Sequence, residues 1–112
     1  MVVFISGPMT GMPDFNRAAF FRAQEFLEEN GFTVLNPAIL PTDLPETAYM
    51  PICLAMLDQC DCFFMLDGWV HSEGAGIELS YAMKQGKYRL IESEGVFRHE
   101  EAEAAMRHEL PR

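Results

Sequence analysis

The sequence has few basic side chains for its length. Its 112 residues hold eight Lys and Arg against 17 Asp and Glu, a formal net charge of −9 at pH 7. The basic residues are scattered, so no local patch offsets the repulsion between this charge and a nucleic-acid backbone. We therefore expect no nucleic-acid polymer as a partner. A small anionic ligand remains compatible with the charge, because backbone amides can bind one phosphate locally.

Cysteine is scarce and long apolar runs are absent. Cys60-x-Cys62 lacks the spacing of a zinc knuckle, and Cys53 completes no second pair, so we expect neither a metal nor a cofactor. Reduced thiols suit a cytoplasmic protein. No run approaches the roughly 20 apolar residues of a membrane span, and the run at residues 2–5 is too short for a signal peptide. We therefore expect a cytoplasmic protein without a membrane partner.

The residues that are present predict one domain over residues 1–112. Hydrophobic residues make up 49% and aromatic residues 12% of the chain, which is enough for a single core. Short apolar runs are typical of buried parallel strands, and they lie at residues 2–5, 32–35, 62–66 and 88–91.

The segments between these strands show helical periodicity, which predicts a helix in each of them. The expected helices run from a cap at Asp14 to residue 30, over residues 51–59 with Pro51 in the first turn, and from Ser72 to about residue 86. Residues 37–48 carry three prolines and are expected to be irregular. We expect residues 92–112 to form a helical tail that caps the domain or touches a partner subunit.

Strands that alternate with helices form βαβ units, and their right-handed crossovers leave few arrangements. We predict a small three-layer α/β fold whose parallel sheet has about four strands in the order 2-1-3-4.

One acidic side chain lies on the inner face of the last predicted helix. At about 100° per residue, Glu73, Gly76, Ser80 and Lys84 form a polar stripe. Glu78 lies roughly 160° from Ser80 on the same helix. The residues one turn away from it are Gly74, Ala75, Tyr81 and Ala82. Glu78 is therefore expected in the interior, either as a structural acid or as a functional carboxylate.

Two glycine-rich loops are expected to meet near this carboxylate. In open parallel sheets, ligands bind beyond the carboxyl ends of the strands where the strand order reverses. Residues 6–11 and 67–76 follow the two strands at that point, and the first loop matches neither a P-loop nor a dinucleotide fingerprint. The second loop places the Ser72 hydroxyl and free amides at a helix N-terminus, which suits one phosphate or carboxylate. Ser72 could equally be only an N-cap.

Three segments carry a family resemblance: FISGPMTGMPDFN, LNPA and CDCFFMLDGWVHSEGAGIELSYAMKQGK. Together they resemble the nucleoside 2-deoxyribosyltransferase superfamily, and within it a branch of small uncharacterised bacterial and phage-type proteins (DUF4406-like). The resemblance covers about residues 3–91. It implies a flavodoxin-like fold and action on N-glycosidic bonds of (deoxy)nucleosides or their monophosphates.

The resemblance also implies residue roles. Glu78 matches the glutamate that forms a covalent glycosyl ester. Ser72 stands where the monophosphate hydrolases carry a phosphate-contacting serine, which favours a nucleoside monophosphate over an unphosphorylated nucleoside. With the two loops, the expected substrate-binding residues are Ser6, Gly7, Pro8, Met9, Ser72, Gly74, Ala75 and Gly76.

Two positions depart from the superfamily's pattern. Phe4 stands where a tyrosine is usual, and Cys53 stands where the proton-handling aspartate is usual. A thiol is a weaker general acid than a carboxyl group. Asp58 or Asp67 could supply the proton instead, and Asp14 is a further supporting candidate.

The departures leave two functions open: an N-glycosidic-bond enzyme, or a nucleotide- or phosphosugar-binding protein on the same fold that has lost efficient catalysis. In either case we expect a homo-oligomer, because so short a domain encloses a ligand poorly by itself. Phe15, Phe21 or Trp69 are the candidate contacts.

Overall fold

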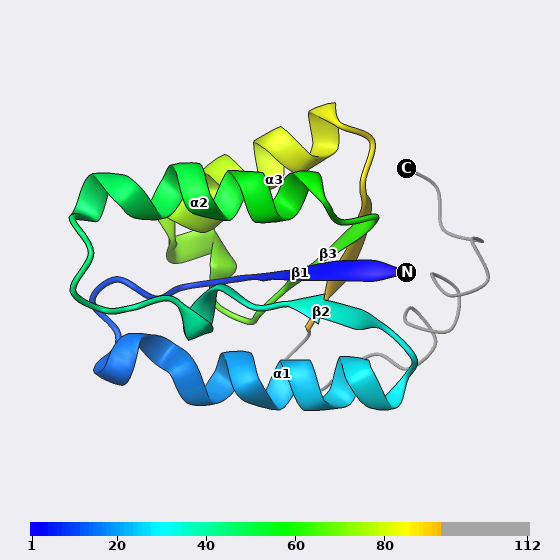
Figure 1. Cartoon of the computed structure of the whole chain (residues 1–112), viewed down its shortest axis with the longest axis horizontal. Helices are drawn as coiled ribbons and strands as arrows, with labels where there is room; N and C mark the ends of the chain where they lie inside the picture. The colour runs from blue at the N-terminus through cyan, green and yellow to red at the C-terminus, as the bar shows by residue number, and fades with distance from the viewer. Residues whose placement is uncertain (93–112) are drawn as a thin grey trace.

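Four parallel strands form a sheet in the order β2-β1-β3-β4 (Figure 1). The structure, a computed structural model, describes residues 1–92, so the predicted tail lies outside the described residues apart from Glu92. The strands are β1 (Val2–Ser6), β2 (Thr33–Leu35), β3 (Cys62–Met65) and β4 (Tyr88–Ile91). The predicted flavodoxin-like α/β fold and its strand order are confirmed.

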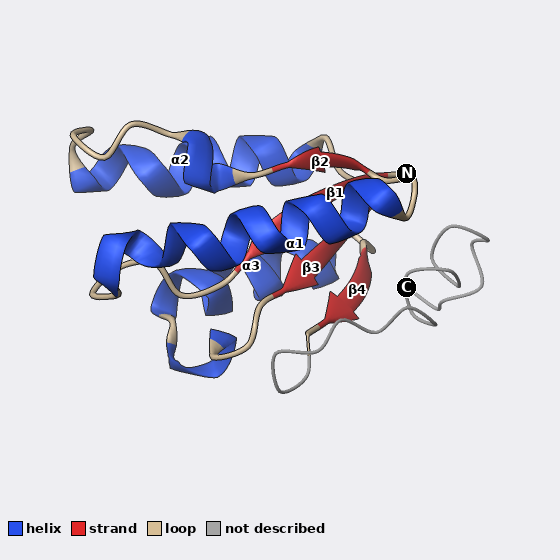
Figure 2. Ribbon diagram, turned by 90° about the horizontal axis from the view of Figure 1, so that it is seen from below, coloured by secondary structure: helices blue, strands red, loops and turns tan. Residues whose placement is uncertain are grey.

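Helices cover both faces of this sheet. The helices are α1 (Arg17–Glu29), α2 (Glu46–Asp58) and α3 (Glu73–Lys84), with short 3-10 turns η1 (Pro13–Asn16), η2 (Pro37–Ile39) and η3 (Trp69–His71). Helix α1 lies on one face, and α2 and α3 lie on the other (Figures 1 and 2). The result is the predicted three-layer arrangement.

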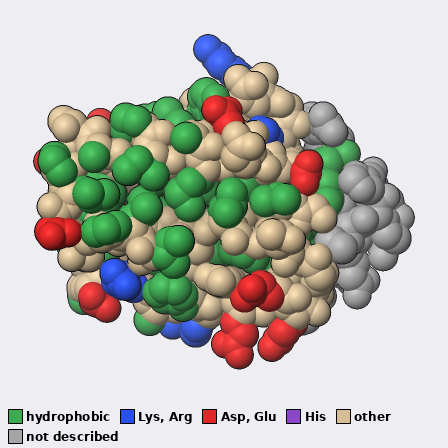
Figure 3. Space-filling model, in the orientation of Figure 1, with side chains coloured by type: hydrophobic (Ala, Val, Ile, Leu, Met, Phe, Trp, Pro, Cys, Tyr) green, Lys and Arg blue, Asp and Glu red, His purple; other side chains and the backbone are tan. Residues whose placement is uncertain are grey.

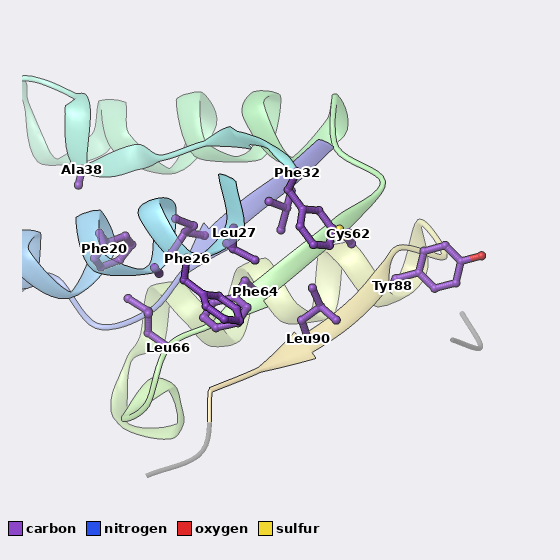
Figure 4. Packing of buried hydrophobic residues seen from close by; sticks show 13 residues of the cluster. Phe20, Phe26, Leu27, Phe32, Ala38, Cys62, Phe64, Leu66, Tyr88 and Leu90 are labelled. Atoms are coloured by element: carbon purple, nitrogen blue, oxygen red, sulfur yellow. The ribbon is translucent and has the colours of Figure 1, made fainter. Parts of the chain in front are cut away.

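Alternation along the strands divides the core into two clusters. Successive side chains of a strand point to opposite faces, so Val3 and Ile5 pack towards α1 while Phe4 packs towards α2 and α3. Figure 4 shows the α1 side of the core. Its aromatic and aliphatic members include Phe20, Phe26 and Leu27 from the helix and Phe64, Leu66 and Leu90 from the sheet side. Ser6 has the same parity as Phe4, so its hydroxyl points towards α2 and α3.

Two predicted helix starts are wrong. Helix α1 begins at Arg17, and its N-cap residue is Asn16, not the predicted Asp14. The side chain of Asn16 makes no capping hydrogen bond. Asp14 lies in η1 with a left-handed φ of 48°, which interrupts any path from it into the helix. Helix α2 begins at Glu46, which puts Pro51 inside it. Proline removes one backbone donor, and burial of the face of α2 against the sheet offsets this loss.

Several large hydrophobic side chains lie at the surface. Those with the greatest exposure are Met12, Phe15, Phe21, Ile39, Val70, Ile77 and Met83. On the face drawn in Figure 3, hydrophobic side chains outnumber basic ones. Trp69 is partly buried and packs against the second core cluster. Within residues 1–92, the helices are too short or too polar to cross a bilayer.

Gly7 brings the loop after β1 against the end of β3. A Cβ atom at Gly7 would lie 2.8 Å from Cβ of Leu66, whereas a Cβ at Gly76 in α3 would have no neighbour within 4 Å. We expect Gly7→Ala to lower the free energy of unfolding by about 1–3 kcal/mol through overpacking. The matched change Gly76→Ala is expected to raise it by about 1 kcal/mol, because glycine is a poor helix former. Urea unfolding of both variants measures the difference, and equal effects would contradict the close packing at Gly7.

Candidate active site

Glu78 is buried in the second turn of α3. Its side chain is 7% exposed, and the other buried residues of the helix are Ala75 and Ala82. These three residues share one face of the helix, opposite the polar stripe of Glu73, Gly76, Ser80 and Lys84. Glu78 therefore points inward although it is only two residues from Gly76 and from Ser80. The predicted inward orientation of Glu78 is therefore observed.

Two neutral donors hold the carboxylate. The hydroxyl of Ser6, itself 1% exposed, donates a hydrogen bond of 2.6 Å to Oε1 of Glu78. The thiol of Cys53 on α2 donates a second hydrogen bond to the same carboxyl group. Among the described residues, no cation contributes to the charge balance of Glu78. The site thus joins the end of β1 to both helices of one face, and it contains a buried acid without a salt bridge.

Burial controls the protonation of Glu78 and Cys53. Loss of solvent raises the pKa of Glu78 to about 7, and the hydrogen bonds from Ser6 and Cys53 limit the rise. Burial also raises the pKa of Cys53 to about 12, and the nearby charge of Glu78 adds to the effect. Near neutral pH, Cys53 is therefore a protonated donor while Glu78 exchanges between its acid and its carboxylate. A carboxyl group with such a pKa suits acid, base or nucleophilic chemistry at physiological pH.

Glu78 opens onto a cavity of about 530 Å³. Such a volume lies within the range of small-molecule sites. The cavity is lined by the loop after β1, the segment after β2 and the amino-terminal parts of α1, α2 and α3. Its apolar wall consists of Ile5, Met9, Phe15, Phe20, Pro37, Ala38, Leu40, Pro41, Met50 and Ile77. Its polar groups include Thr10, Arg17, Thr42, Glu46, Tyr49, His71, Ser72 and Glu73.

The start of α3 supplies hydrogen-bond donors to this cavity. Ser72 is the N-cap, and its Oγ accepts a 3.1 Å hydrogen bond from the amide of Ala75. The hydroxyl proton of Ser72 remains available, because a hydroxyl both accepts and donates. Within the described residues, the amides of Glu73 and Gly74 have no hydrogen-bond acceptor. The N-cap role and the anion-binding role predicted for Ser72 are therefore compatible.

Two basic side chains line the same cavity. Arg17 is the first residue of α1, and no acidic residue stands in the first turn of that helix. A cation at this end of a helix is opposed by the helix dipole. His71 lies just before the cap of α3 and also lines the cavity. Arg17 therefore adds positive charge to the wall of this cavity, and the His71 ring adds a hydrogen-bonding group.

The predicted site residues divide into three groups: residues that line the cavity, Ser6 that holds Glu78, and residues outside the lining. Gly7, Met9, Ser72, Gly74, Ala75 and Glu78 line the cavity. Ser6 supports Glu78 from behind, while Pro8 and Gly76 lie outside the lining. Asp14 and Asp67 are also outside it, and the amide of Asp67 donates a hydrogen bond to Glu92 instead.

The sequence analysis did not place the segment after β2 in the site. Residues 37, 38 and 40–42 line the cavity, and Tyr49 on α2 holds this wall. The Tyr49 hydroxyl donates to the carbonyl of Pro41 and accepts a 3.3 Å hydrogen bond from the amide of Leu44. Buried Asn36 fixes the start of the segment by accepting a 2.9 Å hydrogen bond from the amide of Ala38. The segment follows the carboxyl end of β2, which lies next to β1, and ligands bind beyond the carboxyl ends of such strands. This position could have predicted that the segment lines the site.

Among residues 1–92, no group of three or more His, Cys, Asp or Glu side chains could hold a metal ion. All three cysteines are buried and free.

A protein-family model matches almost the whole of the described chain. The family described as a domain of unknown function (DUF4406) matches residues 1–90, so the chain belongs to this family. No curated protein matches the chain.

Proposed function

We propose that this member of the DUF4406 family cleaves N-glycosidic bonds of (deoxy)nucleosides or nucleoside monophosphates, with Glu78 as the nucleophile. One observation carries the proposal: a buried carboxyl group with a pKa of about 7 lines a cavity of ligand size, and its hydrogen-bond donors within residues 1–92 are neutral. A structural acid at such a depth is normally paired with a cation. Glu78 instead keeps the reactivity that a covalent glycosyl ester requires.

The proposed reaction has two displacements. A carboxylate oxygen of Glu78 attacks the anomeric carbon, the C–N bond breaks, and the base leaves with a proton from Glu46, Glu73 or solvent. Water or a second base then attacks the anomeric carbon of the glycosyl ester and returns a proton to the same group or to solvent. This second displacement gives hydrolysis or transfer and restores the carboxylate of Glu78. Ser6 and Cys53 donate hydrogen bonds to the carboxyl group of Glu78, which lines the cavity.

A nucleoside monophosphate is the substrate class that the walls favour. Free amides at Glu73 and Gly74, the Ser72 hydroxyl and the side chains of Arg17 and His71 are suitable partners for a phosphate. An unphosphorylated nucleoside would leave these donors to water. The apolar wall around Met9 and Phe20 suits the base and the sugar.

The second candidate is a nucleotide- or phosphosugar-binding protein with weak catalysis. The observation that favours it is the thiol of Cys53, whose raised pKa of about 12 makes it a poor proton donor to a leaving base. Besides Glu78, the carboxyl groups in the lining are Glu46 and Glu73. An active enzyme would need one of these two, in place of Cys53, as the general acid.

A homo-oligomer in the cytoplasm completes the proposal. The proposed subunit contacts are Phe15 in η1 and Phe21 on α1, which are both exposed, and Trp69 in η3, which is partly buried. Light scattering at micromolar concentration that shows a monomer would remove this part alone.

A substrate panel separates the two candidate functions. The protein is incubated with deoxynucleosides, deoxynucleoside monophosphates and ribonucleoside monophosphates, and chromatography measures the free base. We expect base release to be fastest from a monophosphate. Tight calorimetric binding without base release would leave the binding protein, and neither binding nor release would overturn both.

A further inference from the structure

Three consecutive residues before α1 have a left-handed backbone. The φ angles are 48° for Asp14, 53° for Phe15 and 59° for Asn16. Asp and Asn tolerate this conformation, whereas a bulky aromatic residue rarely adopts it. Phe15 is therefore the strained member of the turn, which we call the left-handed turn (residues 14–16).

Local hydrogen bonds hold the left-handed turn in place. The amide of Phe15 donates to the carbonyl of Met12 at 3.0 Å, and the side chain of Asn16 donates to the carbonyl of Pro8 at 3.0 Å. The second bond ties the turn to the loop that follows β1. The strain is thus imposed by the surroundings and does not reflect a free loop.

The strained conformation does not bury the side chain of Phe15. No residue of η1 is buried, and the ring of Phe15 is 43% exposed. A large apolar side chain normally enters the core when the backbone is strained to place it, because burial is the main stabilising contribution that it can make. Phe15 lines the cavity of Glu78 instead.

We propose that Phe15 is a ligand-contact residue, which the left-handed turn holds against the aromatic base of a bound nucleotide. This inference rests on the proposed function for the identity of the ligand. The base is the part of a nucleotide that an exposed phenyl ring can cover, because base–aromatic stacking tolerates any base. We place the sugar beside Glu78 and the phosphate beside the donors at the start of α3.

Calorimetry on variants tests this contact. All proteins carry Glu78→Gln so that the ligand stays intact, and the probes are deoxyadenosine monophosphate and 2-deoxyribose 5-phosphate, which lacks a base. Phe15→Asn keeps a residue that tolerates the left-handed backbone but removes the ring. We expect it to weaken binding of the nucleotide about 5- to 150-fold, the range for loss of one stack, and to leave the phosphosugar unchanged. Phe15→Trp is expected to keep nucleotide affinity.

A control variant and a stability measurement complete the experiment. Met83→Ala removes a similarly exposed apolar side chain of α3 outside the cavity, and it should change neither affinity. Relief of strain in Phe15→Asn is expected to raise the melting temperature by about 4 °C, so weaker binding would not reflect unfolding.

The outcomes are distinguishable from failure of the proposed function. Unchanged nucleotide affinity in Phe15→Asn, or equal loss for both probes, would overturn the contact. So would conversion of an oligomer to a monomer by Phe15→Asn with loss of both affinities, since Phe15 would then be a subunit contact. If Phe15→Asn weakens nucleotide binding and the wild-type protein releases no base, the contact would be supported. Only the enzymatic part of the proposed function would then be removed.

Discussion

Replacing Glu78 with glutamine is expected to lower the rate of base release by at least about 10⁴-fold, the scale seen when a nucleophile is lost. Glutamine has nearly the shape of glutamate, but its amide cannot form a glycosyl ester. The affinity for a nucleoside monophosphate should change little, because the phosphate and base contacts lie elsewhere in the cavity. Steady-state base release and calorimetry on the same samples measure the two effects.

The control for this change is Glu28→Gln. Glu28 lies on α1, outside the residues that line the cavity, and the substitution removes the same charge. Its side chain is exposed, so we expect it to take no part in the reaction. A small effect at Glu28 beside a large effect at Glu78 is the expected pattern. Activity within about tenfold of the wild type in Glu78→Gln would exclude a nucleophilic role, since tenfold corresponds to only 1.4 kcal/mol.

The same substitution is expected to stabilise the protein above pH 7. The pKa of Glu78 is about 7 in the folded chain, against 4.5 for a glutamate in water. Between these two values the unfolded chain has lost its proton while the folded chain keeps it, so stability falls as pH rises through this window. The difference corresponds to about 3 kcal/mol once Glu78 is ionised. Below pH 4.5 both states are protonated, and the penalty is absent.

Urea unfolding between pH 4 and 8 measures this penalty as the difference between wild type and Glu78→Gln. The other carboxyl groups titrate in both proteins, so their contributions cancel. We expect the variant to gain up to about 3 kcal/mol relative to wild type as pH rises from 4.5 to 8. A constant difference across this range would mean that Glu78 is not desolvated. A stabilising change at the centre of a site is the signature of a trade between stability and function.

The fold was predictable because its strands are apolar on both faces. Runs such as Val2–Ser6 lie between two layers of helices, so their hydrophobicity is continuous and hard to mistake. The strand order followed from crossover handedness, and the inward face of Glu78 followed from helical spacing. These features depend on the local pattern alone.

The parts that escaped prediction depend on contacts between distant segments. The left-handed φ of Phe15 is held by a side-chain bond from Asn16 to Pro8, which no local propensity reports. The wall formed by residues 40–42 depends on Tyr49, whose two hydrogen bonds order a proline-rich segment that looked irregular. Arg17 was missed because the helix was expected to start at a cap on Asp14. The site's central acid was predictable, whereas its outer walls were not.

The central claim is that Glu78 forms a covalent bond to the sugar. A deoxynucleoside monophosphate with fluorine at the 2′ position slows the collapse of a glycosyl ester, because the fluorine opposes positive charge at the anomeric carbon. The decisive measurement is the mass of the intact protein after mixing with this compound, followed by peptide mapping. The account predicts an added mass equal to the fluorinated sugar phosphate, located on Glu78 and absent in Glu78→Gln. Free base released by the wild type with no adduct on Glu78, or an adduct on another residue, would contradict it.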